Sequence, residues 1–489
     1  MRYSNPAIEK AMSSLDAARP KAEADPDRPV YHFRPPANWM NDPNGTIFHK
    51  GYYHLFYQHN PYGDAWGHMH WGHARSTDLV YWEHLPIALW PSLEAGEEHC
   101  FSGCAWINGQ GQPMLFYTSV SPAEGAEELP NQQWAALSDD AMLTWQKHPA
   151  NPILSLDTHG GPLFEGPWRD PFIFEEAGRV FMVIGASTES EATVALYEAE
   201  DDTLARWAYR GLLIQRPKES LQFFECPNFF KLGDKWLLLT SPYRPVEYYV
   251  GLFDVEALKF EVEGYGILDY GSGKPEEIGY GSNAEYYATN ILWDNAGPDG
   301  QKRCILLGWV RGFKPERGWN GCLALPRVLS IGADGRPRQT PLPELQRLRG
   351  QSCQLSDVAL SDGLHILDIA GDTLEIQAQF ELDRAGEMGL QVRRSEDGER
   401  AVAISYDGQT LNVAGTAIPY PQEAGESTLR LHLFVDKSVL EVFVNDGQAA
   451  ITRVIYPPAA DLGVAVYARG EQTRLSSLHA WQMTSIWAT

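Results

Sequence analysis

The chain has 489 residues, a length that favours two or three domains over a single hydrophobic core. Apolar residues make up 44% and charged residues 21%, the mixture typical of a soluble globular protein. With 64 acidic against 39 basic residues the net charge is −25, which argues against nucleic acids and anionic membranes as partners because both bind clustered lysine and arginine.

Targeting signals and cysteine usage indicate the compartment. No apolar run reaches the ~20 residues that a membrane-spanning helix needs, and residues 1–29 lack the apolar segment of a secretory signal. We therefore expect a cytoplasmic protein with no membrane partner. Six cysteines are too few for a disulfide framework at this length, so we expect them to be reduced. They are Cys100, Cys104, Cys226, Cys304, Cys322 and Cys353.

The first part of the chain predicts an N-terminal arm followed by a long series of strands. Residues 1–29 form the arm, with one helix from Pro6 to Ala18. Residues 30–340 carry short β-branched or aromatic runs bounded by Gly, Pro, Asn or Asp, as strands do. Examples are Tyr52–Gln58, Met114–Thr118, Val180–Ile184, Trp236–Thr240 and Cys304–Val310.

A repeat divides this region into blades. Three segments, S-T-D-L-V-Y-W, S-D-D-A-M-L-T-W and E-D-D-T-L-A-R-W, end at Trp82, Trp145 and Trp207. The tryptophans lie 63 and 62 residues apart, and a unit of that size built from short antiparallel strands is typical of a β-propeller blade. Residues 30–340 have room for five such units. The sequence therefore predicts an all-β fold that begins with a five-bladed propeller.

The C-terminal part predicts a second β domain. Residues 341–352 form a linker with a short helix at Glu344–Arg349. Residues 353–489 alternate apolar and polar positions with hairpin turns at 436–438 and 445–447, a pattern typical of a β-sandwich. The expected strands are Thr373–Phe380, Gly389–Arg393, Ala401–Ser405, Leu429–Val435 and Val439–Asn445.

Three motifs place a carboxylate one or two residues before a proline: W-M-N-D-P-N-G (39–45), W-R-D-P (168–171) and F-E-C-P (224–227). Proline is confined to edge strands, and the innermost strand of a blade is an edge that lines the central channel. Asp170 lies 128 residues after Asp42, about two blade periods, and Glu225 follows 55 residues later. The three acids should therefore meet at one channel.

Such a set of acids suits glycosidic cleavage, which needs one acid to protonate the leaving oxygen and one carboxylate to attack or stabilise the sugar carbon. Pro43 biases Asp42 to an extended backbone and so favours a rigidly held nucleophile. Desolvation beside Phe224 would raise the pKa of Glu225, as a general acid requires. Asp170, next to Arg169, is expected to stay ionised.

These three motifs and four further segments resemble glycoside hydrolase family 32. The further segments are F-Y-Q-H-N-P (56–61), W-G-H-M-H-W-G-H (66–73), F-S-G (101–103) and D-K-S-V-L-E-V-F-V-N-D-G (436–447). The resemblance implies a five-bladed propeller with a β-sandwich, and a retaining mechanism on β-fructofuranosides. It implies that Asp42 is the nucleophile, Glu225 the acid/base and Asp170 the transition-state stabiliser. Positions implied to surround the fructosyl unit are Asn41, Gln58, Trp66, Phe101, Ser102 and Arg169.

We expect hydrolysis of sucrose or short fructo-oligosaccharides, with sucrose-6-phosphate hydrolysis, fructan exo-hydrolysis and fructosyl transfer as alternatives that use the same acids. Inverting arabinan and xylan hydrolases share the three-acid plan, and a non-catalytic sugar-binding protein would share the aromatic channel. His68, His70 and His73 could suggest a metal site, but no accompanying acid pattern is evident, so we expect neither metal nor cofactor. The oligomeric state is left open.

Overall fold

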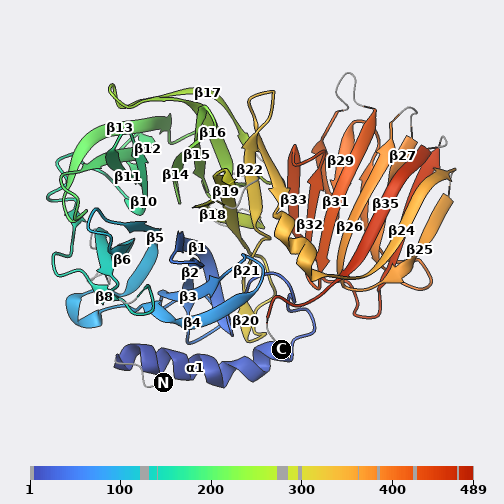
Figure 1. Cartoon of the computed structure of the whole chain (residues 1–489), viewed down its shortest axis with the longest axis horizontal. Helices are drawn as coiled ribbons and strands as arrows, with labels where there is room; N and C mark the ends of the chain where they lie inside the picture. The colour runs from blue at the N-terminus through green and yellow to red at the C-terminus, as the bar shows by residue number, and fades with distance from the viewer. Residues whose placement is uncertain are drawn as a thin grey trace.

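The structure is a computed structural model that describes residues 5–121, 131–139, 141–271, 285–295, 300–361, 363–382, 386–421, 427–470 and 473–487. It shows two all-β parts side by side, with the N-terminal helix along one edge (Figure 1). The sequence prediction of a five-bladed propeller followed by a sandwich is confirmed. No helix in these ranges is long and apolar enough to cross a membrane.

Five antiparallel sheets form the propeller, and in each the first strand is innermost (Figure 1). The first blade is β1 (Asn38–His49), β2 (Tyr52–Asn60), β3 (His70–Ser76) and β4 (Trp82–Leu89). The second is β5 (His99–Ile107), β6 (Pro113–Val120), β7 (Gln132–Leu137), β8 (Gln146–Lys147) and β9 (Leu154–Ser155), after the short 3₁₀ turn η1 (Leu93–Ala95). The third is β10 (Arg169–Glu176), β11 (Arg179–Ser187), β12 (Glu191–Ala199) and β13 (Trp207–Pro217).

The last two blades complete the ring. The fourth is β14 (Asn228–Leu232), β15 (Lys235–Thr240), β16 (Glu247–Asp254) and β17 (Lys259–Ile267). The fifth is β18 (Tyr286–Asp294), β19 (Arg303–Val310), β21 (Cys322–Leu323), β22 (Arg327–Ile331) and β23 (Pro337–Pro341). β20 (Trp319–Asn320) leaves the fifth blade and pairs in parallel with β1, so the last blade is hydrogen-bonded to the first.

The tryptophan repeat has a structural counterpart. Trp82 and Trp207 begin the outermost strands β4 and β13, and Trp145 directly precedes β8. In the fourth blade Phe260 takes the corresponding place near the start of β17. The repeat therefore marks where the chain turns into the last strand of each of these blades.

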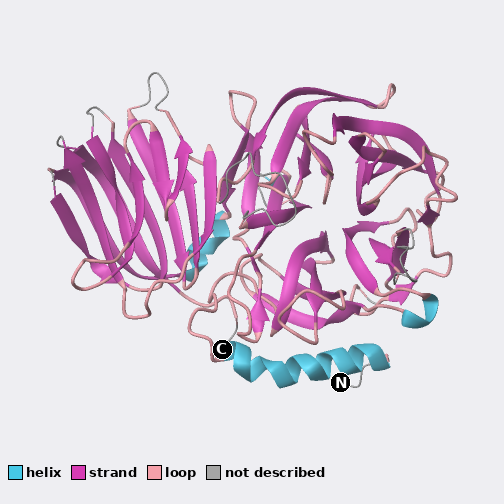
Figure 2. Cartoon of the chain, turned by 180° about the vertical axis from the view of Figure 1, so that it is seen from behind, coloured by secondary structure: helices cyan, strands magenta, loops and turns pink. Residues whose placement is uncertain are grey.

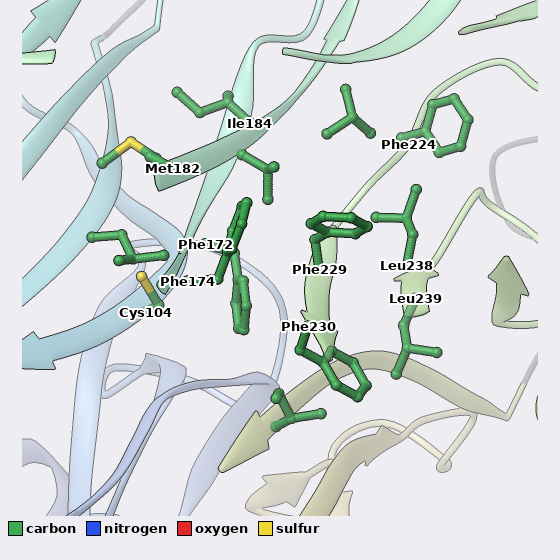
Figure 3. Packing of buried hydrophobic residues seen from close by; sticks show 14 of the residues in the cluster. Cys104, Phe172, Phe174, Met182, Ile184, Phe224, Phe229, Phe230, Leu238 and Leu239 are labelled. Atoms are coloured by element: carbon green, nitrogen blue, oxygen red, sulfur yellow. The ribbon is translucent and has the colours of Figure 1, made fainter. Parts of the chain in front are cut away.

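Aromatic side chains fill the space between neighbouring blades. Figure 3 shows Phe174 of the third blade beside Phe229 of the fourth. Their ring centroids lie 5.1 Å apart in an edge-to-face arrangement, and Phe229 also stacks on Trp236 at 4.8 Å. Such pairs add about 0.5–1.5 kcal/mol to the free energy of burying the rings. This packing fixes the blades around the axis on which the site lies.

The N-terminal helix is longer than expected. The predicted end is Ala18, two residues before Pro20, which lacks an N–H and disfavours helix at the preceding residue. Helix α1 (Pro6–Glu23) instead continues through Pro20. Ala22 beyond the proline is fully buried, as is Ala11, and both belong to the propeller's core cluster. Packing of this face outweighs the lost backbone hydrogen bond.

Two six-stranded sheets form the sandwich, with one hydrophobic core cluster between them (Figure 2). The 3₁₀ helix η3 (Pro343–Leu348) joins it to the propeller where we expected a short helix. One sheet holds β24 (Arg349–Leu360), β35 (Thr473–Met483), β26 (Thr373–Glu381), β31 (Thr428–Asp436), β32 (Val439–Val444) and β33 (Ala449–Val454). The other holds β25 (Gly363–Ala370), β34 (Gly463–Gly470), β27 (Gly386–Arg394), β28 (Val402–Tyr406), β29 (Thr410–Val413) and β30 (Thr416–Pro419).

Fully buried charges join the two parts. Arg327 of the propeller donates to Glu441 Oε2 of the sandwich at 2.6 Å and to Asp269 Oδ2 at 2.9 Å. His32, just before the first blade, contacts Asp436 at 2.8 Å and Glu441 at 2.9 Å. Breaking a buried ion pair leaves an unpaired charge and costs about 3–5 kcal/mol. The two domains are therefore held in a fixed relation.

Candidate active site

The same backbone irregularity recurs on four of the five innermost strands. In β1, Asn41 and Asp42 together oppose one residue of the neighbouring strand, Gln58. Register shifts of the same size occur in β5 at 101–102, in β10 at 170–171 and in β18 at 288–289. A β-bulge re-aims side chains and is common beside active sites. The bulges explain why the motif residues, and not their neighbours, lie at the axis.

The Asp42 carboxylate accepts hydrogen bonds from two blades. Oδ1 accepts from Asn41 Nδ2 at 3.0 Å, and Oδ2 accepts from Gln58 Nε2 at 3.2 Å and from Ser102 Oγ. Asn41 is held in turn by Trp39, whose Nε1 donates to its Oδ1 at 2.7 Å. These donors fix the orientation of the carboxylate.

The glycine of F-S-G explains how Ser102 reaches this carboxylate. A Cβ on Gly103 would lie 1.9 Å from the backbone oxygen of Phe116, so only glycine allows β5 to pack this closely on β6. The Gly103 N–H also donates to Asn44 Oδ1 of β1 at 3.2 Å. The first two blades are thereby joined directly beneath Asp42.

Asp170 is buried, 5% exposed, with a φ of 67° in the left-handed region. Its N–H donates to Thr118 Oγ1 at 3.0 Å, and its Oδ2 accepts from the N–H of Cys226 at 2.9 Å. Cys226 also lies 3.5 Å from Asp42 Oδ2 through its sulfur. The residue that follows Glu225 therefore touches both aspartates, which brings the three acids to one place.

Two donors hold Glu225. Arg169 Nη2 donates to Oε1 at 2.5 Å, and the hydroxyl of Tyr287 lies 2.6 Å from Oε2. The same Arg169 nitrogen donates to the hydroxyl of Tyr243 at 2.8 Å, and its guanidinium lies 4.9 Å from the ring centroid of Phe223. The carboxyl is thus fixed by residues of the third, fourth and fifth blades.

Burial shifts the proton affinity of two of the acids. Desolvation raises the pKa of Glu225, Arg169 lowers it, and the nearby charge of Asp42 raises it further. The raised pKa of Glu225 agrees with the sequence expectation. Desolvation also outweighs Arg169 at Asp170 and raises its pKa to about 7, against our expectation that Arg169 keeps Asp170 ionised. The shortest hydrogen bond of Arg169 is to Glu225, whereas its Nε lies 3.8 Å from Asp170 Oδ2, so Arg169 stabilises the charge of Asp170 less.

An aromatic rim lies beside this hydrogen-bonded cluster. Trp66 is 53% exposed, and its ring centroid is 5.1 Å from that of His99 and 6.1 Å from that of Phe101, the neighbour of Ser102. An exposed ring next to polar groups is a surface on which a sugar can stack. Below the acids, residues of all five blades line a small axial pocket, among them Ser102, Asp170, Cys226 and Thr289.

The structure thus places every residue that the sequence nominated around one axis. The clustered residues are Asn41, Asp42, Gln58, Ser102, Arg169, Asp170 and Glu225, with Trp66 and Phe101 at the rim. Tyr243 and Tyr287 are not among the predicted site residues, and no local motif marks Tyr243. Tyr287 follows Glu225 by 62 residues, one blade period, and this spacing was the available signal.

The three histidines of the 66–73 motif have ordinary structural partners. His73 Nε2 lies 3.0 Å from His54 Nδ1, and His70 Nδ1 lies 2.5 Å from the backbone oxygen of His68. Among the described residues, no group of three His, Cys, Asp or Glu side chains is arranged to hold a metal ion.

A five-bladed propeller with three clustered acids and an exposed tryptophan beside them is suited to cleaving glycosidic bonds. The family model described as "Glycosyl hydrolases family 32 N-terminal domain" matches residues 32–341, and the one described as "Glycosyl hydrolases family 32 C terminal" matches 344–482. The chain belongs to glycosyl hydrolase family 32 and is a glycosidase, as the motifs indicated.

Relatives and solved structures support the assignment to this family. The chain is 31% identical to a levanase of Bacillus subtilis, over 97% of this chain and 73% of the relative. It is 32% identical to a sucrose-6-phosphate hydrolase of Escherichia coli, over 93% and 94% of the two chains. A GH32 beta-fructofuranosidase of Bombyx mori has a similar structure, with a TM-score of 0.82, 29% identity and complete coverage of both chains.

Proposed function

We propose that the protein is a retaining β-fructofuranosidase that releases terminal fructosyl units from sucrose or short fructo-oligosaccharides. The observation that carries the proposal is the contact of three motif acids through Cys226 and Arg169 at the propeller axis. A binding protein would have no need to bring a buried Asp170 and two half-buried acids together, since removing carboxylates from water costs desolvation free energy.

Each acid has surroundings suited to one step. Asp42 is the nucleophile, because hydrogen bonds from Asn41, Gln58 and Ser102 fix the direction of its carboxylate. Glu225 is the acid/base, because its raised pKa keeps a proton available for the leaving oxygen. Asp170 binds fructose hydroxyls and stabilises the oxocarbenium-like transition state.

The reaction then has two displacements. Asp42 attacks the anomeric carbon of the fructosyl unit while Glu225 gives its proton to the departing oxygen, forming a fructosyl ester on Asp42. Glu225, now a base, takes a proton from a water molecule that attacks the same carbon and releases Asp42. Two inversions at one carbon retain its configuration.

Substrate preference is proposed from the charges near the site. Arg169 is engaged by Glu225 and Tyr243, so a sugar phosphate gains no cation there without breaking these bonds. We therefore place sucrose before sucrose 6-phosphate, although one relative is named for the phosphate and another for levan. The cytoplasmic location stays a prediction.

The test is a panel of sucrose, 1-kestose, inulin, levan and sucrose 6-phosphate, each with kcat/KM and the anomer first released. The proposal expects the highest value on sucrose or kestose, β-fructofuranose as first product, and equal glucose and fructose from sucrose. A strong preference for the phosphate would overturn the substrate order. Longer oligosaccharides at high sucrose would indicate fructosyl transfer, and an inverted first product would refute the mechanism.

A further inference from the structure

The sandwich is in direct contact with the blade that holds Tyr287. Its edge strand β33 lies next to the fifth blade (Figures 1 and 2). The backbone of β33 meets the propeller on one side of that blade: the Thr452 N–H donates to Asp269 Oδ1 at 3.0 Å, and the Tyr270 N–H donates to the Ala450 oxygen at 2.9 Å. The end of the same strand holds Glu285.

Glu285 accepts two hydrogen bonds from the sandwich at a single oxygen. Arg453 Nε donates to Oε2 at 2.7 Å, and the Val454 N–H donates to it at 2.9 Å. The other end of the Arg453 guanidinium is bound within the sandwich, where Nη1 donates to Thr416 Oγ1 and to the Ala414 oxygen at 3.3 Å. Both side chains of the pair are less than one fifth exposed. The Arg453 side chain therefore bridges the sandwich hairpin β29–β30 and the propeller.

From Glu285 the connection to the site is short and rigid. The backbone oxygen of Glu285 accepts from the Arg311 N–H at 3.0 Å. Strand β18 begins at the next residue and pairs Tyr287 with Trp309. The Tyr287 ring lies 4.5 Å from the guanidinium of Arg311, and its hydroxyl contacts Glu225 Oε2. Only Tyr286 lies between the anchored Glu285 and Tyr287, whose side chain touches the proposed acid.

We propose that the sandwich is part of the catalytic apparatus, with Arg453 and Glu285 as positioning residues that hold Tyr287 against Glu225. The inference rests on the proposed function, since it assigns Glu225 the acid role. It gives the C-terminal domain a task beyond covering the propeller. It also gives a role to Arg453, whose guanidinium is largely enclosed at the boundary between the two domains.

The experiment is a double-mutant cycle between Arg453→Met and Tyr287→Phe in the full chain. Arg453→Met should lower kcat/KM on sucrose by about tenfold, a part of the 10²–10⁴ that general acids supply, and change KM less than about twofold. In the Tyr287→Phe background the same change should cost less than about twofold, because coupled residues are not additive. On an aryl fructofuranoside with an acidic phenol as leaving group, both losses should shrink, since departure then needs less proton transfer.

The matched control is Arg430→Met, which removes an arginine of the same domain that pairs with the exposed Asp446 at 2.9 Å. It should keep the wild-type rates. If Arg453→Met does not fold, as judged by its melting temperature, Glu285→Gln replaces it, because the amide oxygen can still accept from Val454 and the strand contact is kept.

Different results would refute the positioning role and the proposed function. Additive effects in the cycle, or equal losses on sucrose and on the aryl substrate, would overturn the positioning role while leaving a working fructosidase. A wild-type protein that cleaves none of the fructosides would instead refute the proposed function itself.

Discussion

The buried ring of His32 gives a prediction about stability and pH. Nδ1 contacts Asp436 and Nε2 contacts Glu441, and all three side chains are fully buried. A ring that donates from both nitrogens carries a positive charge. Burial lowers the pKa of His32, but its hydrogen bonds to the two carboxylates outweigh burial and raise the pKa to about 9. A neutral His32 ring has one N–H and could donate to only one of the two carboxylates.

The magnitude follows from this shift. A rise from 6.5 to about 9 corresponds to about 3 kcal/mol of folding free energy, at about 1.4 kcal/mol per pKa unit. Because the folded pKa is the higher one, this stabilisation is complete below pH 6.5 and is lost as the pH rises through 9. For a chain of this size the unfolding entropy makes about 1 kcal/mol equal to about 1 °C, so the melting temperature should fall by about 3 °C across this window.

The assay is the melting temperature from pH 6 to pH 10 for the wild type, His32→Gln and the control His365→Gln. His365 is exposed on β25, so its replacement should leave the curve unchanged. His32→Gln should start about 3 °C or more below the wild type at pH 6, and the gap should narrow as the pH rises. Parallel curves at every pH would show that His32 is not charged in the folded protein, and the reasoning would fail.

Three further results are expected. Arg327→Met should destabilise the protein by about 3–5 kcal/mol, seen as a lower melting temperature, because Asp269 and Glu441 lose their buried partner; a drop below 1 °C would contradict this. Glu225→Gln should lower kcat/KM on sucrose by about 10²–10⁴ and remove the alkaline limb of the pH profile, which in the wild type should lie above the ordinary glutamate pKa of 4.5 because the pKa of Glu225 is raised. Trp66→Ala should raise the KM for sucrose about two- to tenfold with kcat nearly unchanged, since an exposed stacking face contributes about 0.5–1.5 kcal/mol; an unchanged KM would exclude Trp66 from binding.

The propeller could be predicted from the sequence because the segments that mark its blades are local and recur at a regular spacing. Each Asp-to-Trp segment encodes one turn into an outer strand, so Trp82, Trp145 and Trp207 were enough to count blades. The fourth blade carries Phe260 in that place and was therefore not visible as a repeat. The helix end at Glu23 depends on tertiary packing, which outweighs the local effect of Pro20.

The site was predictable where a motif contains the whole signal, and not where partners come from afar. Asn41 and Asp42 lie in one motif, and the blade period adds Ser102 and Asp170. The raised pKa of Asp170 could not be inferred from its neighbour Arg169, because the direction of the guanidinium is set by Glu225, 56 residues away. Contacts such as Arg453 with Glu285, 168 residues apart, follow only from the docking of two domains.

The most direct measurement is mass spectrometry of the Glu225→Gln variant quenched with acid during turnover of the aryl fructofuranoside. Slow hydrolysis of the intermediate is expected in Glu225→Gln, with the aryl fructofuranoside as substrate, so this variant should accumulate the adduct. We predict one anhydrofructose unit on the peptide that contains Asp42, and none when Asp42→Asn is added. A fructosyl group on any other residue, or rapid turnover by Asp42→Asn, would contradict the chemistry assigned to the propeller axis.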